Sequence, residues 1–321
     1  MRAAASLESD TARRHLLTLK GMTRERIEAL LDMAQGYCSR PGRPVRPEPV
    51  LAGRTVANLF FEPSTRTRCS FELAARRLGA EVLNIDIDAS STVKGESLLD
   101  TFATLQAMHI DLFVVRHKEG GTPELLARNA EPHTCVVNAG EGNISHPTQG
   151  LLDALTIRQH KKDFSNLTVA IVGDVRHSRV AASACQVLNT LGVRELRLVG
   201  PAGLLPDAHD AMPGTHFTDM DEGIADADVV MMLRIQTERM ESSLIPDSAS
   251  YFRQYGLNAQ RLALARPDAI VMHPGPMNRG VEIASDVADG PRSVILEQVA
   301  NGVAVRMAVM RHLIETTQET P

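Results

Sequence analysis

The sequence predicts an α/β fold of two similar domains, each a parallel sheet with helices on both faces. Short apolar runs alternate with longer amphipathic stretches along the chain, as happens when each strand is followed by a helix. The polar, turn-rich segment 163–167 interrupts this alternation once, and the alternation then restarts. A length of 321 residues also suits about two domains.

The first domain is expected over residues 1–163. Its apolar runs predict strands, and the stretches between them have helical periodicity. In chain order the expected strands are 56–61, 82–87, 111–115 and 134–138, and the expected helices are 70–78, 97–108, 123–129 and 147–160. In the first helix, Phe71, Ala74, Ala75 and Leu78 share one face, which predicts that this face is buried.

The second domain is expected over residues 164–293. A strand and turn are expected over 168–174, further strands are expected at 195–199, 229–233 and 269–272, and a helix is expected at 180–191. A long amphipathic helix over 294–314 ends the pattern, and we expect the segment 294–321 to pack back on the first domain. Gly302 in this helix costs about 1 kcal/mol relative to Ala, so we expect a break or bend there.

The charge and the aromatic content argue against a nucleic-acid partner. There are 34 Lys and Arg residues against 39 Asp and Glu residues, a formal net charge of −5, and aromatics make up 3% of the chain with no Trp. Proteins that hold single-stranded nucleic acid use stacking rings and a basic groove. This composition therefore favours another class of ligand.

The termini and the cysteines suggest a cytoplasmic protein. The N-terminal residues contain no apolar stretch of about 7–15 residues, which a secretory signal needs. No window approaches the roughly 18 apolar residues of a membrane span. Cys38, Cys69, Cys135 and Cys185 form no Cys-x-x-Cys pair. We expect four reduced, buried thiols and no metal site.

The turn after the first strand is rich in groups that bind anions. Ser64 is a good N-cap for the helix that follows, and Thr65, Arg66 and Thr67 open that helix. A helix N-terminus offers backbone N–H groups and partial positive charge, and Arg binds phosphate bidentately. The alternative is a capped helix with solvated arginines, but capping accounts for Ser64 alone. The Gly-rich loop of nucleoside triphosphate sites is not present here.

This turn carries a family resemblance. Segment 61–68 resembles the carbamoyl-phosphate motif of the aspartate and ornithine carbamoyltransferases, and segment 146–153 resembles their second signature. Segment 88–100 resembles the mobile lysine loop of the aspartate enzymes. Further matches occur, in order, at 114–117, 173–179, 233–236 and 273–276. The resemblance extends over nearly the whole chain, about residues 16–313.

The resemblance implies a carbamoyl-phosphate site. Its residues here are Ser64, Thr65, Arg66, Thr67, Arg116, His146, Gln149, Gly275 and Pro276. The first four hold the phosphate together with Arg116. Thr67, Arg116 and His146 donate to the carbonyl oxygen, so that Arg66, Thr67, Arg116 and His146 are the expected catalytic residues. Gln149 and the backbone carbonyls near Pro276 hold the carbamoyl NH2 group.

The residues expected to bind the acceptor amino acid favour aspartate over ornithine as that substrate. Ornithine enzymes carry a reactive cysteine in a His-Cys-Leu-Pro segment, whereas segment 273–276 has none. An acceptor with two carboxylates needs cations, and the resemblance assigns Lys94, Arg179 and Arg234, with Gln236, to that role. In the family the lysine loop reaches the neighbouring subunit's site. Lys94 and one of Ser90 or Ser91 would then act in trans.

The implied activity is transfer of the carbamoyl group from carbamoyl phosphate to the amine of L-aspartate, the second step of de novo pyrimidine (UMP) biosynthesis. The resemblance implies a homotrimer that needs no metal or organic cofactor. Segment 271–280 resembles the branch that often assembles with a dihydroorotase or its homologue, and a regulatory chain is another possible partner. We expect neither a nucleic-acid nor a membrane partner.

Three alternatives stay open. The first is a carbamoyltransferase with another amino-acid acceptor. The second is a nicotinamide-dependent dehydrogenase, suggested by segment 171–174, although no G-x-G-x-x-G follows that strand. The third is an inactive scaffold homologue, against which the full set of expected catalytic side chains argues.

Overall fold

The computed structural model describes residues 14–38, 47–86, 97–207, 212–235 and 247–318. The chain divides into two compact units. Unit 1 comprises residues up to 148 and from 300 onward, and unit 2 comprises residues 149–299. Each unit contains one parallel sheet, which confirms the predicted fold class. The predicted boundary after residue 163 stays a prediction.

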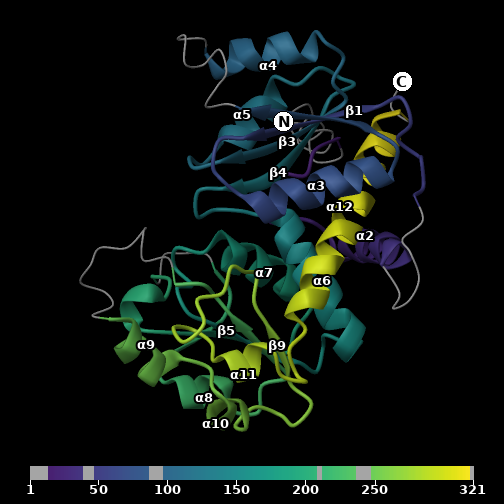
Figure 1. Cartoon of the computed structure of the whole chain (residues 1–321). Helices are drawn as coiled ribbons and strands as arrows, with labels where there is room; N and C mark the ends of the chain where they lie inside the picture. Colours follow the sequence, from purple (N-terminus) through teal and green to yellow (C-terminus); the bar gives the residue numbers. More distant parts are fainter. Residues whose placement is uncertain (1–13, 39–46, 87–96, 208–211, 236–246, 319–321) are drawn as a thin grey trace, which may run out of the picture. The chain divides into compact units, whose positions relative to one another are not determined.

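Unit 1 is built on a four-stranded sheet in the order β2-β1-β3-β4. Its elements are α2 (Arg24–Tyr37), β1 (Thr55–Phe60), α3 (Thr65–Arg77), β2 (Glu81–Asp86), α4 (Leu98–Gln106), β3 (Leu112–His117), α5 (Thr122–Arg128) and β4 (Cys135–Glu141). From β1 the chain continues to β2 at one edge of the sheet, and from β3 it continues to β4 at the opposite edge. Because parallel crossovers are right-handed, α3 covers one face and α4 and α5 the other (Figure 1).

Unit 2 is built on a five-stranded sheet in the order β7-β6-β5-β8-β9. Its elements are β5 (Thr168–Val172), α7 (Arg179–Thr190), β6 (Glu195–Val199), η2 (Ala202–Leu204), β7 (Thr215–Phe217), α8 (Met220–Ile224), β8 (Val229–Met232), α9 (Ser248–Tyr255), α10 (Ala259–Leu262), β9 (Ile270–Met272) and α11 (Ser285–Ala288). The helices α6 (Pro147–Lys161) and α12 (Ile295–Gln318) contain residues of both units.

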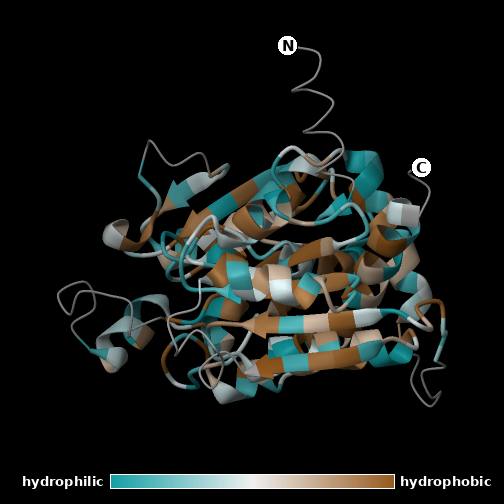
Figure 2. Ribbon diagram, turned by 90° about the horizontal axis from the view of Figure 1, so that it is seen from above, coloured by the Kyte–Doolittle hydropathy of each residue, from teal (hydrophilic) through white to brown (hydrophobic). Residues whose placement is uncertain are grey.

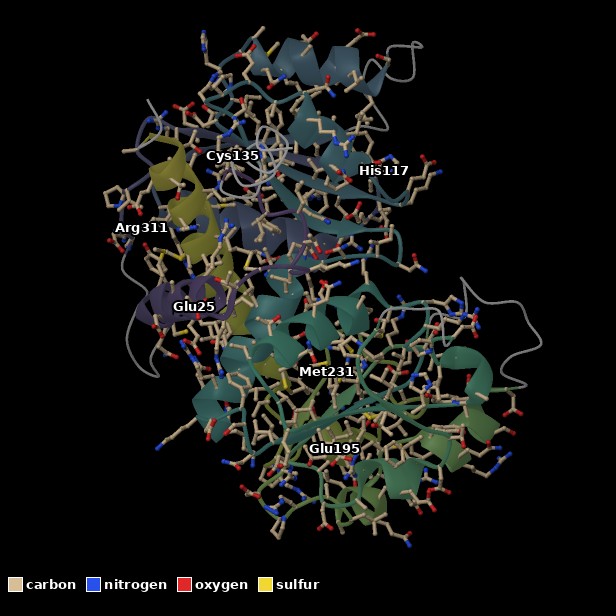
Figure 3. All side chains as sticks on the ribbon, turned by 180° about the vertical axis from the view of Figure 1, so that it is seen from behind. Glu25, His117, Cys135, Glu195, Met231 and Arg311 are labelled. Atoms are coloured by element: carbon tan, nitrogen blue, oxygen red, sulfur yellow. The ribbon has the colours of Figure 1, made fainter. Side chains whose placement is uncertain are left out.

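The strands are buried along their length rather than on alternate residues. All residues of β4, β5 and β8 are buried, because helices cover both faces of each sheet. Brown segments accordingly run along the strands in Figure 2. Phe71, Phe102 and Phe113 fill the core of unit 1, and the expected burial of the Phe71 face of α3 is confirmed. Met231 of β8 lies in the core of unit 2 (Figure 3).

The C-terminal helix α12 runs through Gly302 without a break, so a break there is wrong, and the alternative, a bend, stays a prediction. Buried residues follow this glycine on the helix, and such packing outweighs the propensity cost of a glycine. Within unit 1 the Arg306 guanidinium lies 4.8 Å from the centre of the Phe71 ring. Arg311, labelled in Figure 3, donates to the Tyr37 hydroxyl at 3.0 Å.

The cysteines differ from the expectation of four buried thiols. Cys135 and Cys185 are buried, Cys38 is half-buried and Cys69 is exposed on α3. Burial raises the pKa of Cys135 to about 11 and that of Cys185 to about 12. The tendency of free cysteines to be buried thus predicted the burial of two of the four correctly. None of the helices in the described ranges has the length and apolar character that a bilayer crossing requires.

Candidate active site

The strand order reverses between β1 and β3 in unit 1. In sheets of this kind ligands bind beyond the carboxyl ends of the two strands at the reversal. The turn 61–64 follows β1, and Arg116 stands at the end of β3, where it pairs in register with Phe60. The Phe61 amide donates to the Arg116 carbonyl at 2.9 Å. The anion-binding turn and Arg116 are therefore neighbours at this edge.

Helix α3 begins at Thr65 with Ser64 as its N-cap, but the Ser64 hydroxyl makes no capping hydrogen bond. The predicted N-cap position of Ser64 is confirmed, but the side-chain hydrogen bond typical of an N-cap serine is not formed at its backbone angles of φ −160° and ψ 83°. The first-turn N–H groups of a helix have no intrahelical partner, so they suit an anion. Arg66 is exposed and Thr67 is half-buried in the same turn.

Arg116 is buried, with 8% of its surface exposed. Its Nη1 donates to the Ala139 carbonyl of β4 at 3.1 Å, and its Nη2 donates to Oε1 of Glu62 at 3.2 Å. The guanidinium is thereby held beside the turn that precedes α3. The sequence reasoning assigned no role to Glu62. Glu62 is the one acidic residue within the motif 61–68, and this could have indicated that it pairs with an arginine of the site.

His146 follows β4 and immediately precedes Pro147 of α6, and only 3% of it is exposed. The Glu141 amide donates to the Ser145 carbonyl at 3.0 Å, which closes the loop before it. β4 adjoins β3 in the parallel sheet. The carboxyl edge of this one sheet therefore carries Arg116, the turn at Ser64 and the loop that ends at His146. The structure thus brings the unit 1 part of the predicted site to one edge.

The strand order of unit 2 reverses between β5 and β8. Gly173, just after β5, has φ +131°, and a Cβ there would lie 3.1 Å from the Leu233 carbonyl oxygen. Only glycine suits this position. The close approach joins the segment leading to Arg179, the first residue of α7, to the segment leading to Arg234 after β8. Arg179 is buried and Arg234 is half-buried.

An Asp–His pair lies between Gly173 and Arg179. The side chain of Asp174 is fully buried, and its Oδ1 is 2.8 Å from Nδ1 of His177. The same oxygen accepts from the His177 amide at 3.3 Å. The sequence reasoning missed this pair, although an Asp and a His at i and i+3 were visible. The nearby Arg176 pairs with Asp207.

The turn after β9 contains Gly275 and Pro276, and the peptide bond between them is cis. Gly275 has φ +65°, a conformation that favours glycine. Its amide donates to Nδ1 of the buried His273 at 2.8 Å. Gln149 of α6 is also buried, and its Nε2 donates to Asp153 at 2.9 Å. Asp153 and His273 had no role in the sequence reasoning, although both stand inside quoted motifs.

Four predicted site residues, Ser90, Ser91, Lys94 and Gln236, lie outside the described residues. Among the residues that are described, no group of three or more His, Cys, Asp or Glu side chains could hold a metal ion. The described candidate side chains at the two strand reversals include the guanidinium groups of Arg66, Arg116, Arg179 and Arg234.

Two family models match the chain. The carbamoyl-P binding domain of aspartate/ornithine carbamoyltransferase matches residues 14–159, and the Asp/Orn binding domain matches residues 165–313. Together they extend over most of the described chain.

Solved structures are similar over the same length. Aspartate transcarbamoylase from Trypanosoma cruzi in complex with carbamoyl phosphate and aspartate is 31% identical, with a TM-score of 0.84 over 94% of this chain and 96% of that chain. Its complex with N-(phosphonacetyl)-L-aspartic acid has a TM-score of 0.83 at 31% identity, over 94% and 95%. Ornithine carbamoyltransferase from Thermus thermophilus is 27% identical, with a TM-score of 0.81 over 94% and 99%.

Proposed function

The chain belongs to the aspartate/ornithine carbamoyltransferase family, and we propose that it transfers the carbamoyl group of carbamoyl phosphate to the amine of L-aspartate. The products are N-carbamoyl-L-aspartate and phosphate. Its likeness to the Trypanosoma cruzi aspartate transcarbamoylase complexes supports aspartate as the acceptor. The absence of cysteine from segment 273–276 supports the same acceptor.

One observation carries the proposal: each sheet has its own anion-binding groups at its own strand reversal. In unit 1 these are the start of α3 with Arg66, and Arg116 at the end of β3. In unit 2 they are Arg179 after β5 and Arg234 after β8. The first set suits a phosphate, and the second suits a dicarboxylate, because a guanidinium pairs bidentately with either kind of anion.

Carbamoyl phosphate is held through its phosphate. The first-turn amides of α3, the hydroxyls of Ser64, Thr65 and Thr67, and the Arg66 guanidinium bind the phosphate oxygens. Arg116, held by Glu62 and Ala139, adds a second guanidinium. These groups also stabilise the charge that the phosphate gains as it leaves.

The carbonyl group is activated by hydrogen-bond donors. Thr67, Arg116 and His146 donate to the carbonyl oxygen, which gains negative charge as the amine adds. Gln149 and the carbonyl oxygens of the Gly275–Pro276 turn accept from the carbamoyl NH2 group. The carbonyl carbon is thereby oriented toward the acceptor amine, and correct orientation supplies much of the rate gain in reactions of two bound substrates.

L-Aspartate is held through its two carboxylates. Arg179 and Arg234 bind them, together with Lys94 and Gln236. The neutral amine attacks the carbonyl carbon, the C–N bond forms, and the C–O bond to phosphate breaks. The departing phosphate takes the proton from the amine. No covalent intermediate with the protein is required.

The assembly and the cellular role are part of the proposal. We place the reaction at the second step of de novo pyrimidine biosynthesis, in the cytoplasm. The active form is a homotrimer in which Lys94 and Ser90 or Ser91 serve the neighbouring subunit's site.

The test is a colorimetric assay of carbamoyl-aspartate with the wild type, Arg66→Ala and His146→Ala. We expect each variant to lose at least about 100-fold in kcat, as is typical when a transition-state donor is removed. Arg128→Ala is the matched control, because this exposed arginine of α5 pairs only with the neighbouring Glu124 among the contacts seen. Unchanged turnover in Arg66→Ala and His146→Ala would contradict the site.

A further inference from the structure

A chain of buried hydrogen bonds joins Gln149 to the backbone that leads into the Gly275–Pro276 turn, all within unit 2. Asp153 Oδ1 accepts from Gln149 Nε2 at 2.9 Å and from Gln298 Nε2 at 2.6 Å. Oε1 of Gln298 accepts from the His273 amide at 3.0 Å. Asp153 and His273 are fully buried, and Gln298 is 1% exposed.

The donor and the acceptor of each of these hydrogen bonds follow from the groups at the two ends of the series. A backbone amide can only donate, so Gln298 turns its Oε1 toward His273 and its Nε2 toward Asp153. The amide NH2 is the donor group of a glutamine side chain, so Gln149 also turns its Nε2 toward the Oδ1 of Asp153. The carbonyl oxygen of Gln149 is thereby turned away from Asp153. The orientation of the Gln149 amide is fixed by its neighbours.

A second branch fixes the turn itself. His273 Nδ1 accepts from the Gly275 amide at 2.8 Å, which leaves the proton on Nε2. Nε2 lies 3.2 Å from Oε1 of Glu282 and donates to it. The same carboxylate oxygen accepts from the Asn278 amide. Both side chains are fully buried, so the segment 273–278 is held at two of its amides by one His–Glu pair.

Both branches end at acceptors. Gln149 presents a carbonyl oxygen, and the turn at Gly275 presents backbone carbonyls. A carbamoyl group has an NH2 with two N–H donors, whereas an acetyl group has a methyl group in the same place. A site built from acceptors therefore selects for NH2, because a methyl group would leave buried acceptors without partners.

We propose that Asp153 is a positioning residue that fixes the Gln149 amide, and that this buried chain makes the site select a carbamoyl group over an acetyl group. The inference rests on the proposed function, since it concerns the donor substrate of that reaction. Asp153 does not touch the substrate; it acts through Gln149, and through Gln298 and His273 on the turn.

The test compares carbamoyl phosphate with acetyl phosphate and inorganic phosphate. For Asp153→Ala we expect kcat/KM for carbamoyl phosphate to fall roughly tenfold or more, the effect of one lost hydrogen bond. The inhibition constants of acetyl phosphate and inorganic phosphate are expected to stay within about twofold, because neither ligand uses the acceptors. Gln149→Met is expected to show the same selective loss, and the double variant no further loss.

Two further variants complete the test. Thr156→Val is the matched control: it lies on the same helix, is buried, and loses a hydrogen bond to the Leu152 carbonyl, which is none of the bonds described above. Gln298→Met keeps the bond between Asp153 and Gln149 and removes the link to His273. Gln298→Met is expected to give a smaller loss of kcat/KM for carbamoyl phosphate, with the same selectivity. If Asp153→Ala does not fold, Gln298→Met tests the proposal in its place.

The outcomes separate the two proposals. Equal weakening of all three ligands in Asp153→Ala or Gln298→Met would mean a structural role only and would overturn the positioning role. Additive losses in the double variant would overturn it as well. A folded wild type that forms no carbamoyl-aspartate would instead contradict the proposed function, whatever the variants do.

Discussion

Nη2 of Arg116 lies 3.2 Å from Oε1 of Glu62, and Nη1 of the same guanidinium lies 3.1 Å from the Ala139 carbonyl. The two partners come from the turn after β1 and from β4, on either side of β3. A planar guanidinium held from two sides has one orientation. The Arg116 side chain is only 9% exposed, so these partners help to compensate its buried charge.

Glu62→Ala removes the charged partner. The buried guanidinium is left with one acceptor fewer, and we expect the free energy of unfolding to fall by about 1–3 kcal/mol. We also expect kcat to fall, because Arg116 is no longer fixed beside the phosphate turn. Urea unfolding and the carbamoyl-aspartate assay measure the two effects. Glu124→Ala on α5, which breaks an exposed pair with Arg128, is the control. Unchanged kcat in folded Glu62→Ala would contradict this role.

The proposed sharing of sites between subunits predicts complementation between two inactive variants. Lys94→Ala and Arg66→Ala each remove one residue of every site. If Lys94 acts in trans, random reassembly of the mixed chains leaves about one quarter of the sites with neither substitution. Activity should therefore return in the mixture. Each parent reassembled alone is the control. Mixed trimers that form and regain no activity would contradict a shared site.

The thiols should differ sharply in reactivity. Cys69 is exposed on α3, whereas burial raises the pKa of Cys135 to about 11 and that of Cys185 to about 12. Because the thiolate is the reactive form, a thiol reagent should label Cys69 rapidly and the two buried thiols only after unfolding. Cys69→Ser should remove the rapid phase. Rapid labelling of Cys135 or Cys185 in the native protein, read by mass spectrometry, would disprove this prediction.

His312 on α12 should make stability depend on pH. Burial, with the nearby Arg26, lowers the pKa of His312 below the ordinary value of 6.5. Between the folded pKa and about 6.5 the unfolded chain binds more protons, so stability rises with pH in that window and falls as pH drops below 6.5. His312→Gln should flatten this part of the curve. The free energy of unfolding at several pH values measures it, and an identical slope in the variant would contradict the account.

Most of the long elements were predictable because their signal is local, although the helix α2 (Arg24–Tyr37) was not expected. The expected strand 56–61 corresponds to β1 (Thr55–Phe60), and the expected helix 180–191 corresponds to α7 (Arg179–Thr190). Short elements such as β7 (Thr215–Phe217) and α11 (Ser285–Ala288) were missed, since three or four residues show no periodicity. The break at Gly302 was wrong because tertiary packing, which no local rule contains, outweighs the low helix propensity of glycine.

The site was predictable where residues adjoin in the chain. Ser64 to Thr67 lie at the N-cap and first turn of α3, so their proximity could be predicted, and their role in anion binding stays a prediction. The partners of Arg116 are 54 and 23 positions away, and Asp153 meets Gln298 across 145 positions. Such pairs depend on strand order and helix placement, which the sequence pattern does not contain. The missing capping bond of Ser64 has a different, local cause: the bond depends on the backbone angles of that residue, which its residue type does not determine.

The most direct measurement is the product formed by the purified wild type from carbamoyl phosphate with L-aspartate, and separately with L-ornithine. The account predicts N-carbamoyl-L-aspartate and an equal amount of phosphate, and no citrulline. Citrulline formation, or no carbamoylated product from a folded protein, would contradict transfer to aspartate.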